Sequence, residues 1–169
     1  MSPVRRPAVL RLVASLVLTC LPIACAPQQV RLTPTEQAAY GTRTFNAPLA
    51  NTFAAARERL PQLGYEFAYV DLNSGRIVTK RQLAGVQASI GIFGRESAAM
   101  WLQFDLQFQS LDATHTRVIA TPHMLEDARD VSDQKSWYIG GEQGLRAKWR
   151  AMFENIAAGA ASAGDGAAE

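Results

Sequence analysis

The chain has 169 residues, of which 48% are apolar and 19% charged, proportions that suit one globular domain with additional segments and exclude a disordered or polytopic membrane protein. The formal charge of +2 is unevenly placed, because Arg5, Arg6 and Arg11 lie in residues 1–24, which contain no acid. The remainder carries 14 basic residues against 15 acidic ones, which removes any electrostatic case for nucleic-acid binding.

The N-terminus has the pattern of an export signal. Its arginines precede the apolar run LVASLVLTCL (12–21), which is too short to span a bilayer about 30 Å thick as a helix. The following LPIAC resembles a bacterial lipobox with Cys25 as the lipidated residue, although Pro22 stands where leucine is usual. The sequence therefore predicts a lipoprotein signal peptide over residues 1–24.

Two other interpretations of this segment stay open. Ordinary signal cleavage after the ACA pattern at 24–26 would place Pro27 directly after the cut, where its tertiary amide lacks an N–H and restricts the backbone on both sides. The segment would otherwise remain as an uncleaved anchor. Lipidation at Cys25 is favoured over lipidation at Cys20, because Thr19 precedes the latter.

Acylation of Cys25 would attach the protein to a bilayer, since each buried CH₂ contributes about 0.8 kcal/mol. Ala26 stands where an aspartate commonly retains lipoproteins at the inner membrane, which favours the periplasmic face of the outer membrane. With Cys20 removed and Cys25 capped, no disulfide is expected. The polar residues 25–41 are expected to form a lipidated tether.

The chain beyond the tether alternates strand and helix patterns. TRTFNA (42–47) predicts a short strand. Pro48 suits the first turn of a helix that Pro61 and Gly64 end. Residues 65–80 are typical of a hairpin that turns at NSG.

The next segments are less regular, apart from one strand. Residues 83–97 combine three glycines with apolar residues, which is typical of either a ragged strand pair or a mobile loop. AMWLQFDLQFQS (99–110) alternates strictly, which predicts a sheet with one face on a core. Residues 115–123 predict another strand, in which Pro122 ends the pairing or marks an edge. A polar loop with an acidic cluster is expected at 125–143.

A final helix is expected from about Gly144, because large apolar residues recur there at helical spacing. They are Leu145, Trp149, Met152, Phe153 and Ile156. Residues 159–169 are of low complexity and are predicted to be a disordered tail whose removal does not matter. The predicted fold is a single α+β domain over 42–158: an antiparallel sheet of about five strands with two helices packed on one face, in β-α-β4-α order.

The segment FNAPLANTFAAARERLPQLGYEFAYVDLNSGRIVTKR (45–81) combines an aromatic strand, a helix ending in LxxLGY and a strand pair that closes on DxNSGRIVT. It resembles a family of bacterial lipoprotein domains with a TATA-binding-protein-like or helix-grip fold, such as those of the lipoprotein component of the outer-membrane β-barrel assembly machine. The resemblance implies the fold and the envelope compartment, and it carries over no catalytic residue.

The candidate chemical motifs favour no reaction. DLNSG (71–75) departs from a calcium loop, because its glycine comes fifth and Gln82 stands where glutamate is needed. His115 and His123 would lie about 26 Å apart along an extended strand, too far for one metal ion. No serine has the strand–turn–helix setting of a hydrolase nucleophile. A non-enzymatic protein without metal or cofactor is therefore expected.

Two stretches form the candidate partner-binding surface, since exposed apolar residues in loops mark interaction sites. Their residues are Val86, Ile90, Ile92, Phe93, Trp137 and Tyr138. The alternative is that both stretches cap the core. The sequence thus predicts a lipid-anchored periplasmic protein that binds an envelope protein. A carrier or sensor of an apolar small molecule is the second hypothesis, and it requires a cavity beside Phe104, Trp149 and Phe153.

Overall fold

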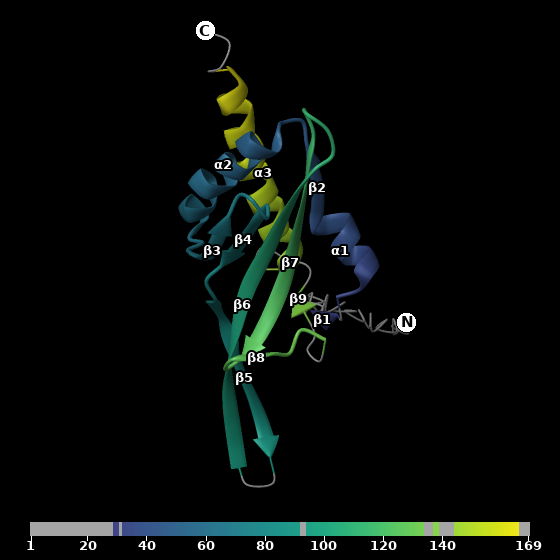
Figure 1. Ribbon diagram of the computed structural model, residues 1–169. Coiled ribbons are helices and arrows are strands. Elements are labelled where there is room, and N and C mark those ends of the chain that lie inside the picture. The colour runs from purple at the N-terminus through teal and green to yellow at the C-terminus, as the bar shows by residue number, and fades with distance from the viewer. Residues whose placement is uncertain (1–28, 31, 92–93, 134–136, 139–143, 166–169) are drawn as a thin grey trace, which may run out of the picture.

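The computed structural model describes residues 29–30, 32–91, 94–133, 137–138 and 144–165. A long antiparallel sheet dominates the fold, and two helices lie over one of its faces (Figure 1). The helices are α1 (Pro34–Tyr40), α2 (Leu49–Arg59), the 3-10 helix η1 (Leu60–Leu63) and α3 (Leu145–Asp165). This arrangement confirms the predicted α+β class with an antiparallel sheet.

The main sheet has seven strands in the order β2-β7-β6-β4-β3, with β5 paired to β6 and β8 paired to β7. They are β2 (Thr42–Phe45), β3 (Phe67–Asp71), β4 (Arg76–Thr79), β5 (Gln82–Gly91), β6 (Gly94–Ser110), β7 (Thr116–Glu126) and β8 (Arg129–Asp130). A separate two-stranded sheet joins β1 (Gln29–Val30) to β9 (Trp137–Tyr138). The sequence predicts about five strands, because β8 has only two residues and carries no periodic pattern, and β5 lies in the segment for which a loop stayed open.

The core lies between the sheet and the pair formed by α2 and α3. The apolar face of β6 is buried, as its alternation predicts, and Phe104 and Leu106 are fully buried. Phe53 of α2 meets Phe108 with ring centroids 5.0 Å apart. The predicted apolar stripe of α3 is buried along its whole length, and the Trp149 indole N–H donates to the Ala120 carbonyl at 2.8 Å. Alternation and helical spacing therefore predicted the two faces that pack together.

Within 83–97 the described residues form a strand pair, the first of the two structures that the sequence allowed. β5 pairs with the first part of β6 from Gln82 opposite Leu102 to Gly91 opposite Gly94. The hairpin extends well beyond the helices and the rest of the sheet (Figure 1). We call the described residues 85–91 and 94–100 the ribbon.

The expected tether from residue 25 to 41 is wrong for its second half, because α1 packs on the domain. Thr33 and Glu36 form a capping box at the start of α1. The Gln37 amide donates to the Thr121 hydroxyl of β7 at 2.9 Å, and Arg146 of α3 lies 3.6 Å from the Glu36 carboxylate. Polar composition suggested a tether, whereas these polar groups bind the domain surface.

The predicted disordered tail is also wrong for 159–165, which continue α3. Alanine has the highest helix propensity, so an alanine-rich end extends a helix that is already packed. Gly159 and Ala160 are buried. A Cβ on Gly159 would lie 3.0 Å from the Cβ of Ala55, so the missing side chain lets α3 approach α2 closely.

Pro122 marks a local edge, the second of its two predicted roles. Strand β7 continues past it to Glu126, and Pro122 pairs with Phe104 of β6. The Ala120 N–H, two residues earlier, donates to the Gly41 carbonyl. Backbone groups two residues apart in a strand point to the same side, so the Pro122 nitrogen also points toward the edge that β2 covers. Strand β2 has already ended at this level. The missing N–H therefore breaks no sheet hydrogen bond.

Candidate partner-binding site

The ribbon is a two-stranded extension of the sheet. The pairing of β7 with β6 begins at Met100 opposite Glu126, so the first residues of β6 have β5 as their strand neighbour. At about 3.4 Å per residue, the part of β5 from Val86 to Gly91 extends roughly 20 Å. An extension of this length places the backbone of this part of β5 far from the core.

The outer edge of β5 is open. Strand β3 covers the outer edge of β4, but within the described residues β5 pairs with β6 alone. Alternate backbone N–H and C=O groups of β5 therefore point away from the sheet and are free for another strand. A register shift between Leu83 and Gly85 interrupts the pairing at the base of the ribbon, and the register is regular beyond it.

The composition of β5 leaves this edge unprotected. Exposed edge strands commonly carry charged residues or proline, which discourage pairing with other chains. The strand sequence QLAGVQASIG contains neither. Val86 is 66% exposed and Leu83 is 59% exposed, the two most exposed large apolar side chains that the structure describes. The edge combines free hydrogen-bonding groups with apolar side chains.

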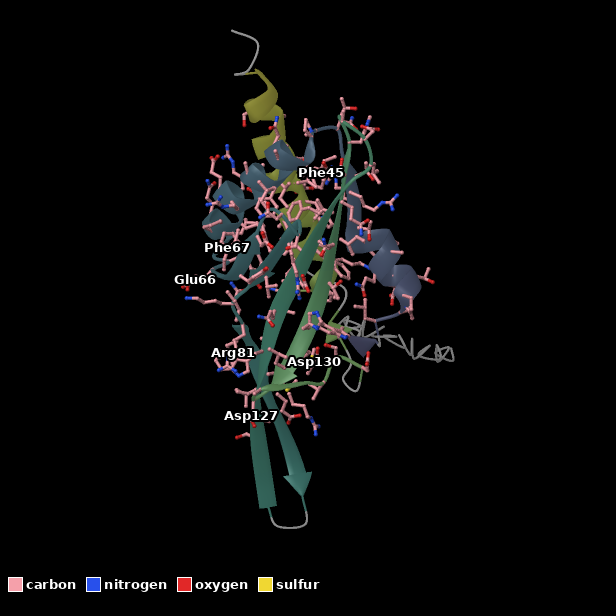
Figure 2. All side chains as sticks on the ribbon, in the orientation of Figure 1. Phe45, Glu66, Phe67, Arg81, Asp127 and Asp130 are labelled. Atoms are coloured by element: carbon pink, nitrogen blue, oxygen red, sulfur yellow. The ribbon has the colours of Figure 1, made fainter. Side chains whose placement is uncertain are left out.

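The ribbon contributes little to the core. Among the described side chains, none between Ile77 and Leu102 belongs to the core cluster. Its base is held instead by Arg81, whose guanidinium lies 5.3 Å from the Trp101 ring centroid. The same guanidinium donates to the Asp127 carbonyl at 2.9 Å, and Figure 2 shows both residues at this base. These contacts fix the point from which the ribbon projects.

The structure separates the predicted site residues. Val86 lies exposed on the ribbon, and Ile90 pairs through its backbone with Arg95. Ile92 and Phe93 lie outside the described residues, as does Cys25. The prediction that Trp137 lies on an exposed surface is wrong, because it is 4% exposed and belongs to the core cluster. The backbone of Tyr138 pairs with Gln29.

Sequence reasoning selected exposed apolar residues and missed the open edge. The uncharged run from residue 82 to 91 was the available signal. That run also fits a central strand, where both edges are paired and charges are excluded by burial. Whether the run is an edge strand or a central strand depends on which strands pair with β5, and only the tertiary structure shows this.

The two histidines take part in separate surface pairs. Nδ1 of His115 lies 2.9 Å from the Asp112 carboxylate, and Nδ1 of His123 lies 2.7 Å from Asp130. Hydrogen bonds from the Thr114 backbone N–H and from His115 lower the pKa of Asp112 to about 2. In the part of the chain that the structure describes, no three histidine, cysteine, aspartate or glutamate side chains form a metal-binding group.

The cavity required by the carrier hypothesis does not lie where the sequence placed it. Phe104, Trp149 and Phe153 are 0%, 1% and 3% exposed and pack in the core. A hollow of about 180 Å³ lies farther along the same interface, where β5, β6, β7 and β9 meet the first turn of α3. Within the described part of the chain, no helix has the length and apolar character needed to cross a membrane.

Comparison with known proteins assigns no family to the chain. No protein-family model matches it, and no curated protein matches it. Among solved structures, the chain is similar to a DUF4468 family protein from Bacteroides ovatus, with a TM-score of 0.37 and 10% identity. That match covers 70% of this chain and 84% of the other. At this level the likeness carries no argument about fold family or activity.

Proposed function

We propose that the protein is a non-enzymatic lipoprotein, anchored through acylated Cys25 to the periplasmic face of the outer membrane, which binds an envelope protein along β5. The observation that carries the proposal is the open, uncharged outer edge of β5 on a ribbon outside the core. An extended segment of the partner would add to this edge as a strand, with backbone hydrogen bonds supplying affinity.

The lipid anchor at Cys25 would place the ribbon near the membrane surface. Cys25 precedes Gln29 of β1 by four residues, so covalent geometry allows at most about 14 Å between them. Since α1 packs on the domain, the acyl chains would hold the domain close to the bilayer. A partner strand that reaches β5 would then belong to a protein at the same membrane surface.

The anchor is tested by labelling cells with an alkyne fatty acid and separating inner and outer membranes. Wild type is expected to label and to fractionate with the outer membrane, and Cys25→Ser is expected to lose both properties. Cys20→Ser is the matched control, because that residue would leave with the signal peptide. Labelling of Cys25→Ser, or its retention in the outer membrane, would contradict the anchoring.

The edge is tested by placing a photo-crosslinking amino acid at Val86 in cells. Leu111 is the control position, because it is 45% exposed and lies in the turn after β6, at the far end of that strand. We expect a discrete adduct from position 86, none from position 111, and mapping of the adduct to an extended segment of the partner.

A charge at the edge should weaken this interaction. Val86→Lys adds a cation that must be desolvated when another strand pairs, so we expect an adduct from neighbouring Gln87 to fall at least fivefold. Leu111→Lys should leave that adduct unchanged. Equal yields in both variants, or adducts of equal strength at positions 86 and 111, would overturn strand addition at β5.

A further inference from the structure

The hollow at the base of the ribbon is separate from the open edge. It lies on the helix-covered side of the sheet and has a volume of about 180 Å³. Strands β5, β6, β7 and β9 and the first turns of α3 converge on it. The residues that bear on its chemistry are Leu83, Leu102, Met124, Trp137, Leu145 and Lys148.

The inner wall of the hollow is apolar and fixed. Leu102, Trp137 and Leu145 are 8%, 4% and 3% exposed, so they form a packed rim of the core. An engineered apolar cavity of about 150 Å³ in another protein holds a benzene molecule. The present hollow therefore accommodates an apolar group of about six to eight carbons.

One cation stands at this apolar wall. Lys148 follows Leu145 by three residues and so lies on the same side of α3. It forms no ion pair with any carboxylate that the structure describes. Arg146 on the neighbouring face is engaged, since it lies beside Glu36 and 4.2 Å from the centroid of the Tyr40 ring. The first turn of α3 contains no acidic residue.

An apolar wall with one cation that pairs with no described carboxylate suits an amphiphile with an anionic head. We propose that the hollow binds a free medium-chain fatty acid, whose alkyl chain packs on Leu102, Trp137 and Leu145 and whose carboxylate pairs with Lys148. The charge of Lys148 disfavours an alkyl ammonium ion, and the volume limits the buried chain to about eight carbons. This binding does not depend on the partner strand at β5.

The test measures octanoate binding by isothermal titration calorimetry. The protein is the full chain in phosphatidylcholine nanodiscs, with empty nanodiscs as the blank. Wild type is expected to bind one octanoate saturably and to bind octanol and octylammonium at least threefold more weakly, because each lacks the ion pair with Lys148. Equal affinity for octanoate and octanol would overturn the assignment of the carboxylate to Lys148, and an absence of saturable binding would overturn the site itself.

Three variants locate the site. Lys148→Glu is expected to reverse the preference between octanoate and octylammonium, whereas Arg150→Glu makes the same charge change on an exposed position of α3 and should have no effect. Ala84→Trp projects a large ring from β5 into the hollow and should weaken octanoate binding at least tenfold. Unchanged binding in Ala84→Trp, in protein with a wild-type melting temperature, would overturn the proposal. Val86→Lys should retain octanoate binding, which separates this test from that of the β5 edge.

Discussion

Buried polar side chains at the residue scale tie the segments of the sheet and helices together. The Thr79 hydroxyl accepts from the Phe104 backbone N–H at 2.9 Å, and the Thr116 hydroxyl donates to the Ala47 carbonyl at 2.8 Å. Thr52 donates to Pro48 from inside α2, whose N-cap lacks a side-chain hydrogen bond. Each of these three buried hydroxyls therefore has the hydrogen-bond partner that burial requires.

Tyr65 is a buried titratable side chain whose ionisation bears on stability at high pH. It is 6% exposed and meets the Phe104 ring edge-on, with centroids 5.9 Å apart. Burial raises the pKa of its phenol to about 12. The folded state thus keeps the phenol neutral where the unfolded chain ionises it.

The stabilising contribution of Tyr65 should disappear in alkaline solution. Because the folded pKa is raised, this contribution is complete below about pH 10 and is lost as the pH rises toward 12, at about 1.4 kcal/mol per pH unit. Tyr65→Phe should unfold with a flatter pH profile, measured by urea denaturation from pH 7 to about 11.5. Tyr69→Phe, at a position that is 47% exposed, should retain the wild-type slope. If the free energy of unfolding of Tyr65→Phe and of wild type changed with pH in parallel, ionisation of Tyr65 would not be the cause of the alkaline loss of stability.

Helix α3 is the element on which the core depends most. Its apolar stripe faces the sheet, and Phe153 packs on Phe45 of β2 with ring centroids 6.1 Å apart. Its last turns lie against α2, where Gly159 faces Ala55 and Arg59. The helix therefore joins the sheet, α2 and α1 in one packed unit.

Shortening α3 should destabilise the domain although its sequence there is of low complexity. A chain that stops after Ala158 loses the buried Gly159 and Ala160, so we expect its free energy of unfolding to fall by about 1–2 kcal/mol. A chain that stops after Asp165 is the control and should match wild type. The measurement is the urea midpoint of each truncated chain, and identical midpoints would show that the last turns of α3 add no stability.

The whole molecule divides into a helix-covered core and an uncovered ribbon. In Figure 1 the ribbon projects from the end of the sheet opposite the C-terminus. The core cluster runs from β2 and α2 to α3 without any described ribbon side chain. Stability and partner binding are therefore expected to reside in different parts of the molecule.

Removal of the ribbon should leave a folded domain. Gly85 and Met100 are paired neighbours, so residues 86–99 can be replaced by Asn-Gly, which forms a two-residue hairpin turn. We expect a melting temperature within about 4 °C of wild type, the shift that a loss of about 1 kcal/mol produces in a chain of this size. Octanoate binding should be retained. Circular dichroism measures the melting temperature, and calorimetry measures octanoate binding. A chain that fails to fold would show that the ribbon is structural.

Local sequence patterns predicted those helices and strands in which the buried residues recur at the period of the element itself. Strict alternation identified the buried face of β6, and helical spacing identified the stripe of α3, because a side chain's direction repeats along one element. Pro61 likewise lies in η1, where the regular α-helix has ended, and Gly64 caps η1 with a left-handed φ of 82°. The export signal at Cys25 is of the same local kind, and it stays a prediction.

Contacts between remote segments decided the rest. Polar residues in α1 bind Thr121 and Arg146, so a segment with tether-like composition became part of the domain. Trp137 lies in a polar stretch yet is buried, because β9 pairs with β1 more than 100 residues earlier. The open edge of β5 depends on where β3 ends, because β4 and β5 pair with the same edge of β6 and β3 covers β4 alone. The sequence by itself thus determined which faces are apolar, whereas the tertiary structure decided what covers each face and which edge is left uncovered.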